Sequence, residues 1–286
     1  MTNVDQFTSM FRAATREVFQ HETLRIRSVL SVTDRDADGA KAFGDQARKF
    51  LSVITADEGF RWTDVAGDDF RTVGDLLELV ESSDPDLICT YRNLHSTAWR
   101  WPYSLGTHLD VLTQHTNVPV VVLPHPEAER TAEHAMTKTS TVMAITDHLS
   151  GDNRLINYAL GFTAKRGRLW LTHVEDEATF ERYMEVISKI PAIDTDEARE
   201  RIREQLLKGP TDYIESCAKV LHGEKLLVTI EPLVVFGHHL PEYRKLIEDQ
   251  KVDLLVMNAK DEEQLAMHGV AYPLAVETRQ IPLLML

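Results

Sequence analysis

Strand-like apolar runs alternate with helix-patterned segments along the second half of the chain. The apolar runs lie at residues 141–146, 168–174, 225–230, 253–257 and 281–286. Helical patterns are expected near residues 152–165, 178–222, 241–250 and 270–278, the second of them interrupted near Pro191 and at Gly209-Pro210. Short runs rich in β-branched residues are typical of strands buried on both faces, so this alternation predicts a parallel α/β sheet.

The first half shows the same alternation in a shorter form. After an N-terminal amphipathic segment, strand-like runs lie at 24–32, 60–66, 86–90 and 118–123, with helical segments at 39–54 and 72–81. Two registers are open. Either the first strand of this half is missing, or residues 29–32 are that strand, equivalent to 142–145, and a later strand is lost. The spacing to Asp86 favours the missing first strand.

The two halves resemble each other most at their C-terminal ends. Residues 84–90 and 251–257 both predict a strand, followed by a polar loop, a glycine, a helical stretch and a last strand opened by proline. The spacing from Gly106 to Pro119 equals that from Gly269 to Pro282. We interpret this as an internal duplication, with an abbreviated first repeat at 1–124, a polar linker at 125–140 and a second repeat at 141–286.

Composition narrows the functional classes. The 286 residues are 43% hydrophobic and 27% charged, as in ordinary globular proteins, and the formal net charge is −14. Basic residues form no long run, so a nucleic acid partner is not expected. The longest apolar stretch, 118–124, is far shorter than the roughly 20 residues that span a bilayer, and a signal-peptide pattern is lacking. With only Cys89 and Cys217, we expect a cytoplasmic protein without disulfides or direct membrane insertion.

Several stretches together carry a resemblance to a known family. They are VMAITD (142–147), RLWLTHVED (168–176), VDLLVMNAKD (252–261) and HGVAYPLAVETRQIPLLML (268–286), with DPDLICTYRN (84–93) and LGTHLDVLTQHTNVPVVVLP (105–124) in the first half. In these the chain resembles a tandem universal stress protein.

The resemblance implies two open, five-stranded parallel sheets with helices on both faces. This is the flavodoxin-like or Rossmann-like arrangement of the adenine nucleotide alpha hydrolase type. Many family members bind ATP or a related nucleotide, and members pair through their last strands. In a tandem chain the two repeats are expected to pair internally along 118–123 and 281–286, because apolar edge strands invite pairing. A further homodimer stays open.

The nucleotide loop of the family has the form Gly-x2-Gly-x9-Gly followed by Ser or Thr, since glycine lets the backbone approach phosphate closely. In the second half, residues 258–270 keep only Gly269, and Val270 replaces the hydroxyl residue. The acidic residues 261–263 would repel a triphosphate. In the first half, Gly106 and Thr107 match the final pair, but residues 91–105 contain no glycine. Both loops are therefore interpreted as degenerate.

The first-half loop contains aromatic and basic side chains instead: Arg92, Trp99, Arg100, Trp101 and Tyr103. We favour the interpretation that these aromatics pack over a lost site. The alternative is a pocket for another anionic or planar ligand.

The resemblance also implies nucleoside-binding positions in the second half. Asp147 ends the first strand, where the family's acid contacts the nucleoside, Val174 ends the second strand near the adenine site, and Asn258 begins the loop after the fourth strand. It is equally open that Asp147 caps a helix and Val174 is simply core. Asp34 follows the run taken as the second strand, so it is not expected to take the acid's role.

Metal and catalytic sites find little support. His238, His239, Glu242 and His268 could approach one another, but adjacent histidines usually point apart and a structural zinc site needs about four converging ligands. Neither cysteine has a positioned base, so nucleophilic catalysis is not expected. The charged region 178–222 is interpreted as a solvated helix face or as a lid over a pocket.

These observations favour a non-catalytic, stress-response binding protein that acts on other proteins or on a small-molecule ligand. No cofactor is expected, although ATP or AMP binding stays open. One alternative is an adenine-nucleotide sensor or weak ATPase that uses the second repeat, with Asp147, Val174 and Gly269 as its remnants. Another is a regulatory domain for a membrane transporter.

Overall fold

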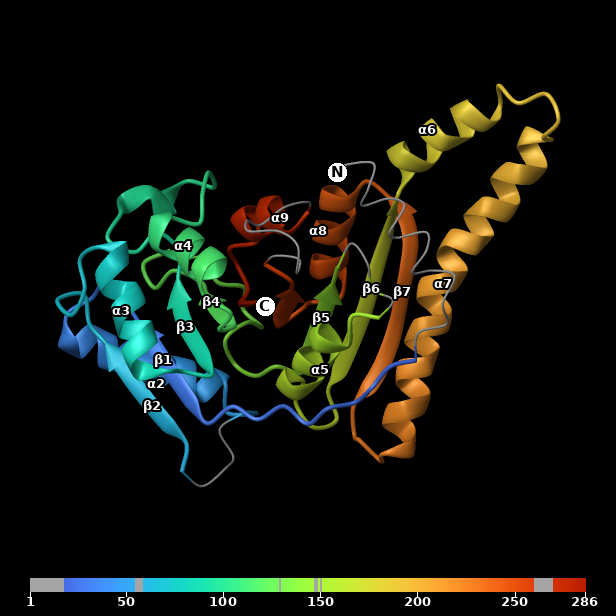
Figure 1. The fold of residues 1–286 in the computed structure, drawn as a ribbon. Helices are drawn as coiled ribbons and strands as arrows, with labels where there is room; N and C mark the ends of the chain where they lie inside the picture. The colour runs from blue at the N-terminus through green and yellow to red at the C-terminus, as the bar shows by residue number, and fades with distance from the viewer. Residues whose placement is uncertain (1–17, 55–58, 129, 147–148, 150, 260–269) are drawn as a thin grey trace.

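The computed structural model describes residues 18–54, 59–128, 130–146, 149, 151–259 and 270–286. They form a single nine-stranded sheet in the order β2-β1-β3-β4-β9-β8-β5-β6-β7 (Figure 1). The strands are β1 (Ser28–Val32), β2 (Arg61–Val65), β3 (Leu87–Tyr91), β4 (Val120–Leu123), β5 (Thr141–Ile145), β6 (Arg168–Asp176), β7 (Thr229–Gly237), β8 (Leu254–Met257) and β9 (Leu283–Met285). The expected α/β fold is confirmed.

Helices pack against this sheet along its whole width. They are α2 (Ala37–Phe50), α3 (Val73–Ser83), α4 (Thr107–His115), α5 (Asn153–Phe162), α6 (Glu177–Ile187), α7 (Thr195–Gly223), α8 (His239–Asp249) and α9 (Ala271–Glu277), with a short 3-10 helix at Thr97–Arg100. Local chemistry fixes several starts. In α3, for example, Thr72 and Asp75 form a reciprocal capping box.

The two halves join through their last strands. Every strand pair in the sheet is parallel except β4–β9, which is antiparallel with Val121 opposite Leu284. Both strands are buried over their whole length, so pairing removes two apolar edges from solvent. The expected pairing of the last strands is confirmed. The expectation of two separate sheets is wrong, because this pairing fuses four strands of the first half and five of the second into one sheet.

The strand order also settles the register of the first half. β1 lies between β2 and β3, in the same way that β5 lies between β6 and β8. β1 is therefore the first strand of its half, and the favoured hypothesis of a missing first strand is wrong. The strand without an equivalent is the edge strand β7. An edge strand can be lost while the buried central strands keep both neighbours, whereas loss of a central strand would open the core.

The chain before β1 crosses the second half instead of extending the strand. Asn157 accepts from Glu22 N at 3.0 Å through Oδ1 and donates through Nδ2 to Gln20 O at 3.0 Å, which ties this segment to α5. The strand begins at Ser28, where Asp86 Oδ2 accepts from the backbone nitrogens of Arg27 and Ser28. The expected strand start at residue 24 is therefore too early.

Helices α6 and α7 form an arm that projects from the body (Figure 1). The break between them, at residues 188–194, contains Pro191 as expected. The expected break at Gly209-Pro210 is absent. The helix α7 has 29 residues and runs through Pro210 without interruption. Only the C-terminal part of α7 buries side chains against the sheet: Tyr213, Ile214, Cys217 and Leu221.

Strand β7 also differs from expectation. It starts at Thr229 and pairs with β6 over nine positions as far as Gly237, whereas a strand at 225–230 was expected. Lys225 has a positive φ of 58° and lies in the turn that precedes the strand. The longer pairing with β6 determines where this strand lies.

Candidate functional site

The loops that follow β1 and β3 diverge at the carboxyl edge of the sheet. Since β1 has β2 on one side and β3 on the other, the chain switches direction here. Open α/β sheets bind ligands in the crevice at such a switch point. Asp34 lies in this crevice, just after the end of β1 at Val32. It therefore occupies the strand-end position of the acid, contrary to the expectation from the sequence.

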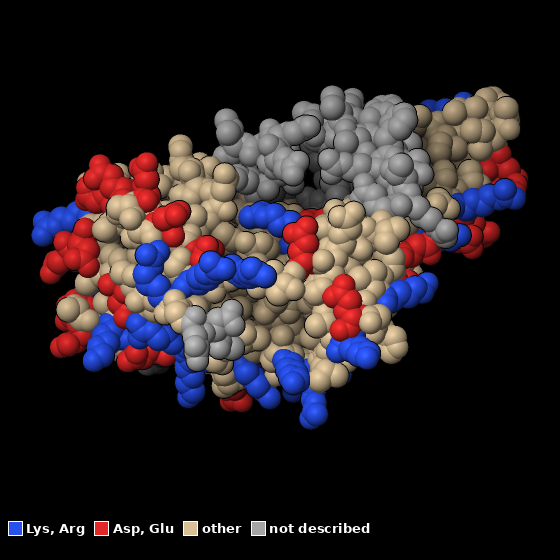
Figure 2. Space-filling model, turned by 60° about the horizontal axis from the view of Figure 1, so that its bottom comes forward, with Lys and Arg blue, Asp and Glu red and all other residues tan. Residues whose placement is uncertain are grey.

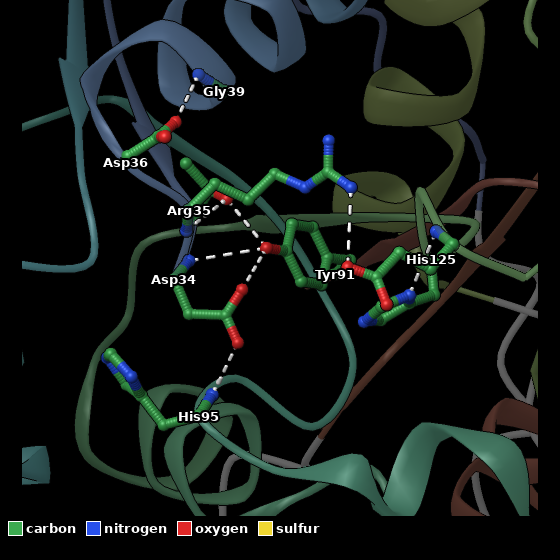
Figure 3. A network of polar contacts seen from close by, with 9 residues as sticks. Asp34, Arg35, Asp36, Gly39, Tyr91, His95 and His125 are labelled. Carbon is green, nitrogen blue, oxygen red and sulfur yellow. Dashed lines mark hydrogen bonds and ion pairs between the residues drawn. The ribbon is translucent and has the colours of Figure 1, made fainter.

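Two hydrogen-bond donors hold the Asp34 carboxylate (Figure 3). The Tyr91 hydroxyl donates to Oδ1, and the backbone nitrogen of His95 donates to Oδ2 at 2.7 Å. The same hydroxyl lies 2.6 Å from Thr33 Oγ1 and accepts from Asp34 N at 3.2 Å. Burial, helped by the hydrogen bond to Asp34, raises the pKa of Tyr91. Tyr91 therefore stays protonated and keeps the carboxylate in one orientation.

The loop after β2 packs directly on the Asp34 loop. Gly67 N donates to Arg35 O at 2.6 Å, and a Cβ at Gly67 would lie 2.4 Å from Asp34 O. Only glycine permits this close approach. On the other side, Asp36 caps α2 by accepting from Gly39 N at 2.8 Å (Figure 3). The loops after β1, β2 and β3 thus support one another around Asp34.

A cavity of about 450 Å³ lies between these loops. Its lining residues are Asp34, Arg35, Asp36, Gly67, Asp68, Arg71 and His95. The volume falls in the range of about 300–1,000 Å³ that is usual for small-molecule sites, but the lining is charged where such sites are mostly apolar. The arrangement therefore suits a small polar ligand.

His95, which lines the cavity, packs against further aromatic and histidine rings. The His95 ring centroid lies 4.8 Å from that of Phe70 and 5.5 Å from that of His108. His108 is buried, and burial, with the nearby His95 as a second cause, lowers its pKa. On the other side of the network, His125 packs edge-on against Tyr91 at 4.8 Å, and burial lowers its pKa as well. Both histidines therefore favour the neutral form.

The loop at 92–106, which occupies the position of the family's phosphate loop, has its two ends joined by a backbone hydrogen bond. Asn93 N donates to Leu105 O at 2.8 Å, and Gly106 has a φ of 92°. A Cβ at Gly106 would lie 2.6 Å from Asn93 Cα, so this glycine serves close backbone packing within the loop. Thr107, the other residue of the matched pair, is the first residue of α4 and is exposed.

The basic and aromatic side chains of this loop separate into two groups. Trp99 stacks on His125 at 4.4 Å, and Arg92 is buried. Arg92 donates to Ala275 O through Nη2 at 2.7 Å, and also to Thr278 O. These two residues pack inward, so the favoured interpretation of packed aromatics holds for Trp99 but not for the other two aromatic side chains of the loop. Trp101 and Tyr103 point to solvent.

The second-half candidates occupy different surroundings. Asp147 and Gly269 lie outside the described residues. Asn258 follows β8 and donates to Asp152 Oδ2 at 2.6 Å, while the other oxygen of Asp152 caps α5 by accepting from Leu155 N. Val174 is buried inside β6, which continues to Asp176, so Val174 does not end the strand. The structure thus brings together Asn258 and the start of α5 and places Val174 in the core.

The structure also shows how potential metal ligands and the two cysteine thiols are placed. Among the described residues, no group of three or more His, Cys, Asp or Glu side chains is placed to hold a metal ion. Cys89 and Cys217 are buried, and burial raises the pKa of both thiols, that of Cys217 to about 12. Neither thiol is therefore activated as a nucleophile.

A sequence match points to Asp34, but it is visible only when β1 is taken as the first strand of its half. Ser31-Val-Thr-Asp34 closely matches Ala144-Ile-Thr-Asp147, and both segments begin with the last two residues of the first strand of their half. Tyr91 and His95 carried no comparable signal, because they reach Asp34 only through the pairing of β1 with β3.

Comparison with known proteins gives likeness at the level of the fold. No family model matches the chain, and no curated protein matches it. A functionally unknown protein from Pseudomonas aeruginosa PAO1 is 11% identical over 91% of this chain and 92% of its own, with a TM-score of 0.50. A protein from Pseudomonas aeruginosa UCBPP-PA14, provisionally named a universal stress protein, is 12% identical over 91% and 93%, also with a TM-score of 0.50.

At these identities the likeness shows the fold alone, which this chain shares with those two structures. It transfers no ligand or activity to this chain. No helix in the described part of the chain has both the length and the apolar character that crossing a membrane requires.

Proposed function

We propose that this chain is a non-catalytic tandem binding protein of the universal stress protein type, and that its ligand site is the cavity beside Asp34. The observation that carries the proposal is the fixed Asp34 carboxylate at the switch point, held by Tyr91 and His95 and facing a cavity of about 450 Å³. A carboxylate held in one orientation recognises a hydroxyl or amine donor at little cost in ordering.

The charge pattern of the cavity restricts the ligand class. Arg35 and Arg71 supply positive charge, and Asp36 and Asp68 supply negative charge. A small ligand with hydroxyl or amine donors and at most one compact anionic group fits this pattern. The closed loop at 92–106 offers no cradle for a triphosphate, so the β- and γ-phosphates of ATP would add no affinity.

The state of the two cysteine thiols supports the non-catalytic part of the proposal. Both thiols are buried with raised pKa values, and Asp34 is occupied by two donors. The alternative is an adenine-nucleotide sensor or weak ATPase in the second repeat. In that repeat, the Asn258 amide is engaged by Asp152, which weakens this alternative.

The test is a thermal-shift and calorimetric screen with adenosine, AMP, ATP with and without Mg²⁺, free amino acids and sugar phosphates. A ligand at one hundred times its Kd should stabilise the protein by about 2.7 kcal/mol. We expect at least one small polar compound to bind wild type and to lose binding in Asp34→Asn. The matched control is Asp38→Asn, an exposed aspartate in the first turn of α2 that does not line the cavity.

Three results would overturn the proposal. The first is that no compound stabilises the wild type. The second is that Asp34→Asn binds as tightly as Asp38→Asn. The third is Mg²⁺-dependent ATP binding much tighter than AMP binding, with phosphate release, which would favour the nucleotide sensor.

A further inference from the structure

Two large aromatic side chains stand exposed at the tip of the loop 92–106. Trp101 is 58% exposed and Tyr103 is 79% exposed. Such side chains usually bury most of their surface, since each can remove about 150–250 Å² from water. Their exposure side by side is therefore a feature that the fold itself does not explain. Tryptophan, tyrosine and arginine are also the residues most enriched at the energetic centres of protein interfaces.

The backbone beneath these side chains is firmly held. Trp101 N donates to Ala98 O at 2.9 Å and closes the 3-10 turn, while Trp99 anchors that turn by stacking on His125. The side chain of Asn93 donates to Ser104 O at 3.3 Å from the opposite arm of the loop. A partner that docks here would therefore order few degrees of freedom, which favours binding.

Arginines from three segments lie near Trp99, two positions before Trp101 in the same loop. Arg100 lies 5.4 Å from the Trp99 ring, and Arg279 donates to Trp99 O at 3.4 Å. Ala132 N donates to Gln280 O at 2.9 Å, and burial together with the nearby charge of Arg130 lowers the pKa of Arg279. Among the residues that the structure describes, none of these three arginines forms an ion pair with a carboxylate. A locally basic surface thus lies on a chain whose net charge is −14.

We propose that Arg100, Trp101, Tyr103, Arg130 and Arg279 form a docking surface for an acidic segment of a partner protein. Carboxylates of that segment would pair with the arginines, and an apolar side chain would pack on Trp101 and Tyr103. Charge complementarity carries the choice of partner, because an acidic peptide gains from this local basic surface whatever the total charge of the chain. The surface shares no residue with the lining of the Asp34 cavity.

A nucleic acid fits the same surface less well, although bases also stack on aromatic rings. An extended polyanion is repelled by the net negative charge of the protein, and its binding requires many contacts with cationic side chains. Figure 2 shows basic and acidic side chains interspersed over another face of the protein, and the net charge of the chain is −14. The chain would therefore repel an extended polynucleotide while accepting a short acidic segment.

The test begins with selection from a displayed library of random dodecapeptides on the full-length protein. We expect enrichment of peptides that combine Asp or Glu with an aliphatic or aromatic residue. The affinity of a selected peptide is then measured by calorimetry and by the blue shift of tryptophan emission as Trp101 is covered. Trp101→Ala should weaken binding about thirtyfold or more, as expected at an interface centre. Arg100→Gln with Arg279→Gln should weaken binding and flatten its salt dependence.

The matched control is Tyr183→Ala, which removes an exposed tyrosine from the distant arm. It should leave peptide affinity unchanged. Enrichment without an acidic bias, equal binding by Trp101→Ala and the control, or tighter binding of single-stranded oligonucleotides than of acidic peptides would each overturn the proposal. So would self-association of the wild type that Trp101→Ala abolishes, because it would assign the surface to a second copy.

Discussion

Gly106 shows how a residue that fits a ligand motif can be required by the fold itself. Its φ of 92° and its close approach to Asn93 exclude a side chain. We predict that Gly106→Ala destabilises the protein by about 1–3 kcal/mol, the usual cost of a strained backbone conformation. Urea denaturation measures this directly.

A second glycine supplies the control for this prediction. Gly74 lies inside α3, and a Cβ there would meet only Thr72 Oγ1, at an ordinary contact distance of 3.6 Å. Gly74→Ala should therefore stabilise the protein by up to about 1 kcal/mol, the difference in helix propensity. If both substitutions shift the denaturation midpoint in the same direction and by similar amounts, the assigned role of Gly106 is wrong.

His108 couples stability to pH. Burial and His95 lower its pKa in the folded state from the ordinary value of 6.5. Below that value the unfolded chain binds a proton that the folded chain does not, so stability is fully present above pH 6.5 and is lost as pH falls. This one group contributes a slope of at most about 1.4 kcal/mol per pH unit, the limit for a single proton.

Comparing the pH dependence of the unfolding free energy of wild type and His108→Phe isolates the contribution of His108. His108→Phe, next to Phe70 and His95, should lose less unfolding free energy than wild type between about pH 7.5 and pH 5.5, because it removes the titrating group. His115→Phe, at an exposed position near the end of α4, should follow wild type. Parallel pH profiles for wild type and His108→Phe would contradict the prediction.

At the scale of elements, Arg92 joins the loop after β3 to the C-terminal end of α9. Its guanidinium donates to the carbonyls of Ala275 and Thr278, and its positive charge lies at the end of the helix where the dipole is negative. Arg279 returns the contact by donating to Trp99 O. The two halves are therefore connected by side chains as well as by the sheet.

We predict that Arg92→Met costs about 2–3 kcal/mol or more, because it leaves buried carbonyls without donors. Arg92→Lys should recover only part of this loss, since a single ammonium cannot reproduce the fork of the guanidinium. Hydrogen exchange should report faster exchange in α9 for Arg92→Met. Exchange confined to the loop 92–106 would show that the contact does not stabilise α9.

Most elements were predictable from the sequence, and the exceptions have a common cause. The apolar runs predicted all nine strands of the sheet, because buried parallel strands leave a local pattern. The position of β7 was wrong because Glu231 and Pro232, which have weak strand propensity, interrupt its run of strand-forming residues. Its pairing with β6 sets its bounds instead. Long-range pairing of this kind is not encoded in a local pattern.

The site was less predictable than the elements for the same reason. Tyr91 and His95 lie 57 and 61 positions from Asp34 along the chain and meet it only because β1 pairs with β3. When residues 24–32 are taken as the second strand, only Asp147 follows a first strand, and Asp34 is passed over. With β1 as the first strand, the match between Asp34 and Asp147 becomes visible, and the candidate site moves to the first half.

At the scale of the whole molecule, the β4–β9 pairing makes one hydrophobic core out of two halves. Val121 and Leu284 face each other at the joint, and both are completely buried. Neither half can lose this contact without exposing an apolar strand edge. We therefore expect the halves to unfold together in a single transition, although each has its own strands and helices.

Val121→Ala tests this cooperativity. The lost buried methyl groups should cost about 1–3 kcal/mol, and the loss should shift the unfolding of both halves equally. Trp62 in β2 and Trp170 in β6 lie on either side of the joint, so versions in which one of them is the sole tryptophan of the four report on each half by fluorescence. Val186→Ala, on the exposed face of α6, is the control and should change neither signal. If Val121→Ala moved only the Trp62 signal, the halves would be independent folding units held side by side, and the continuous sheet would not be the source of their stability.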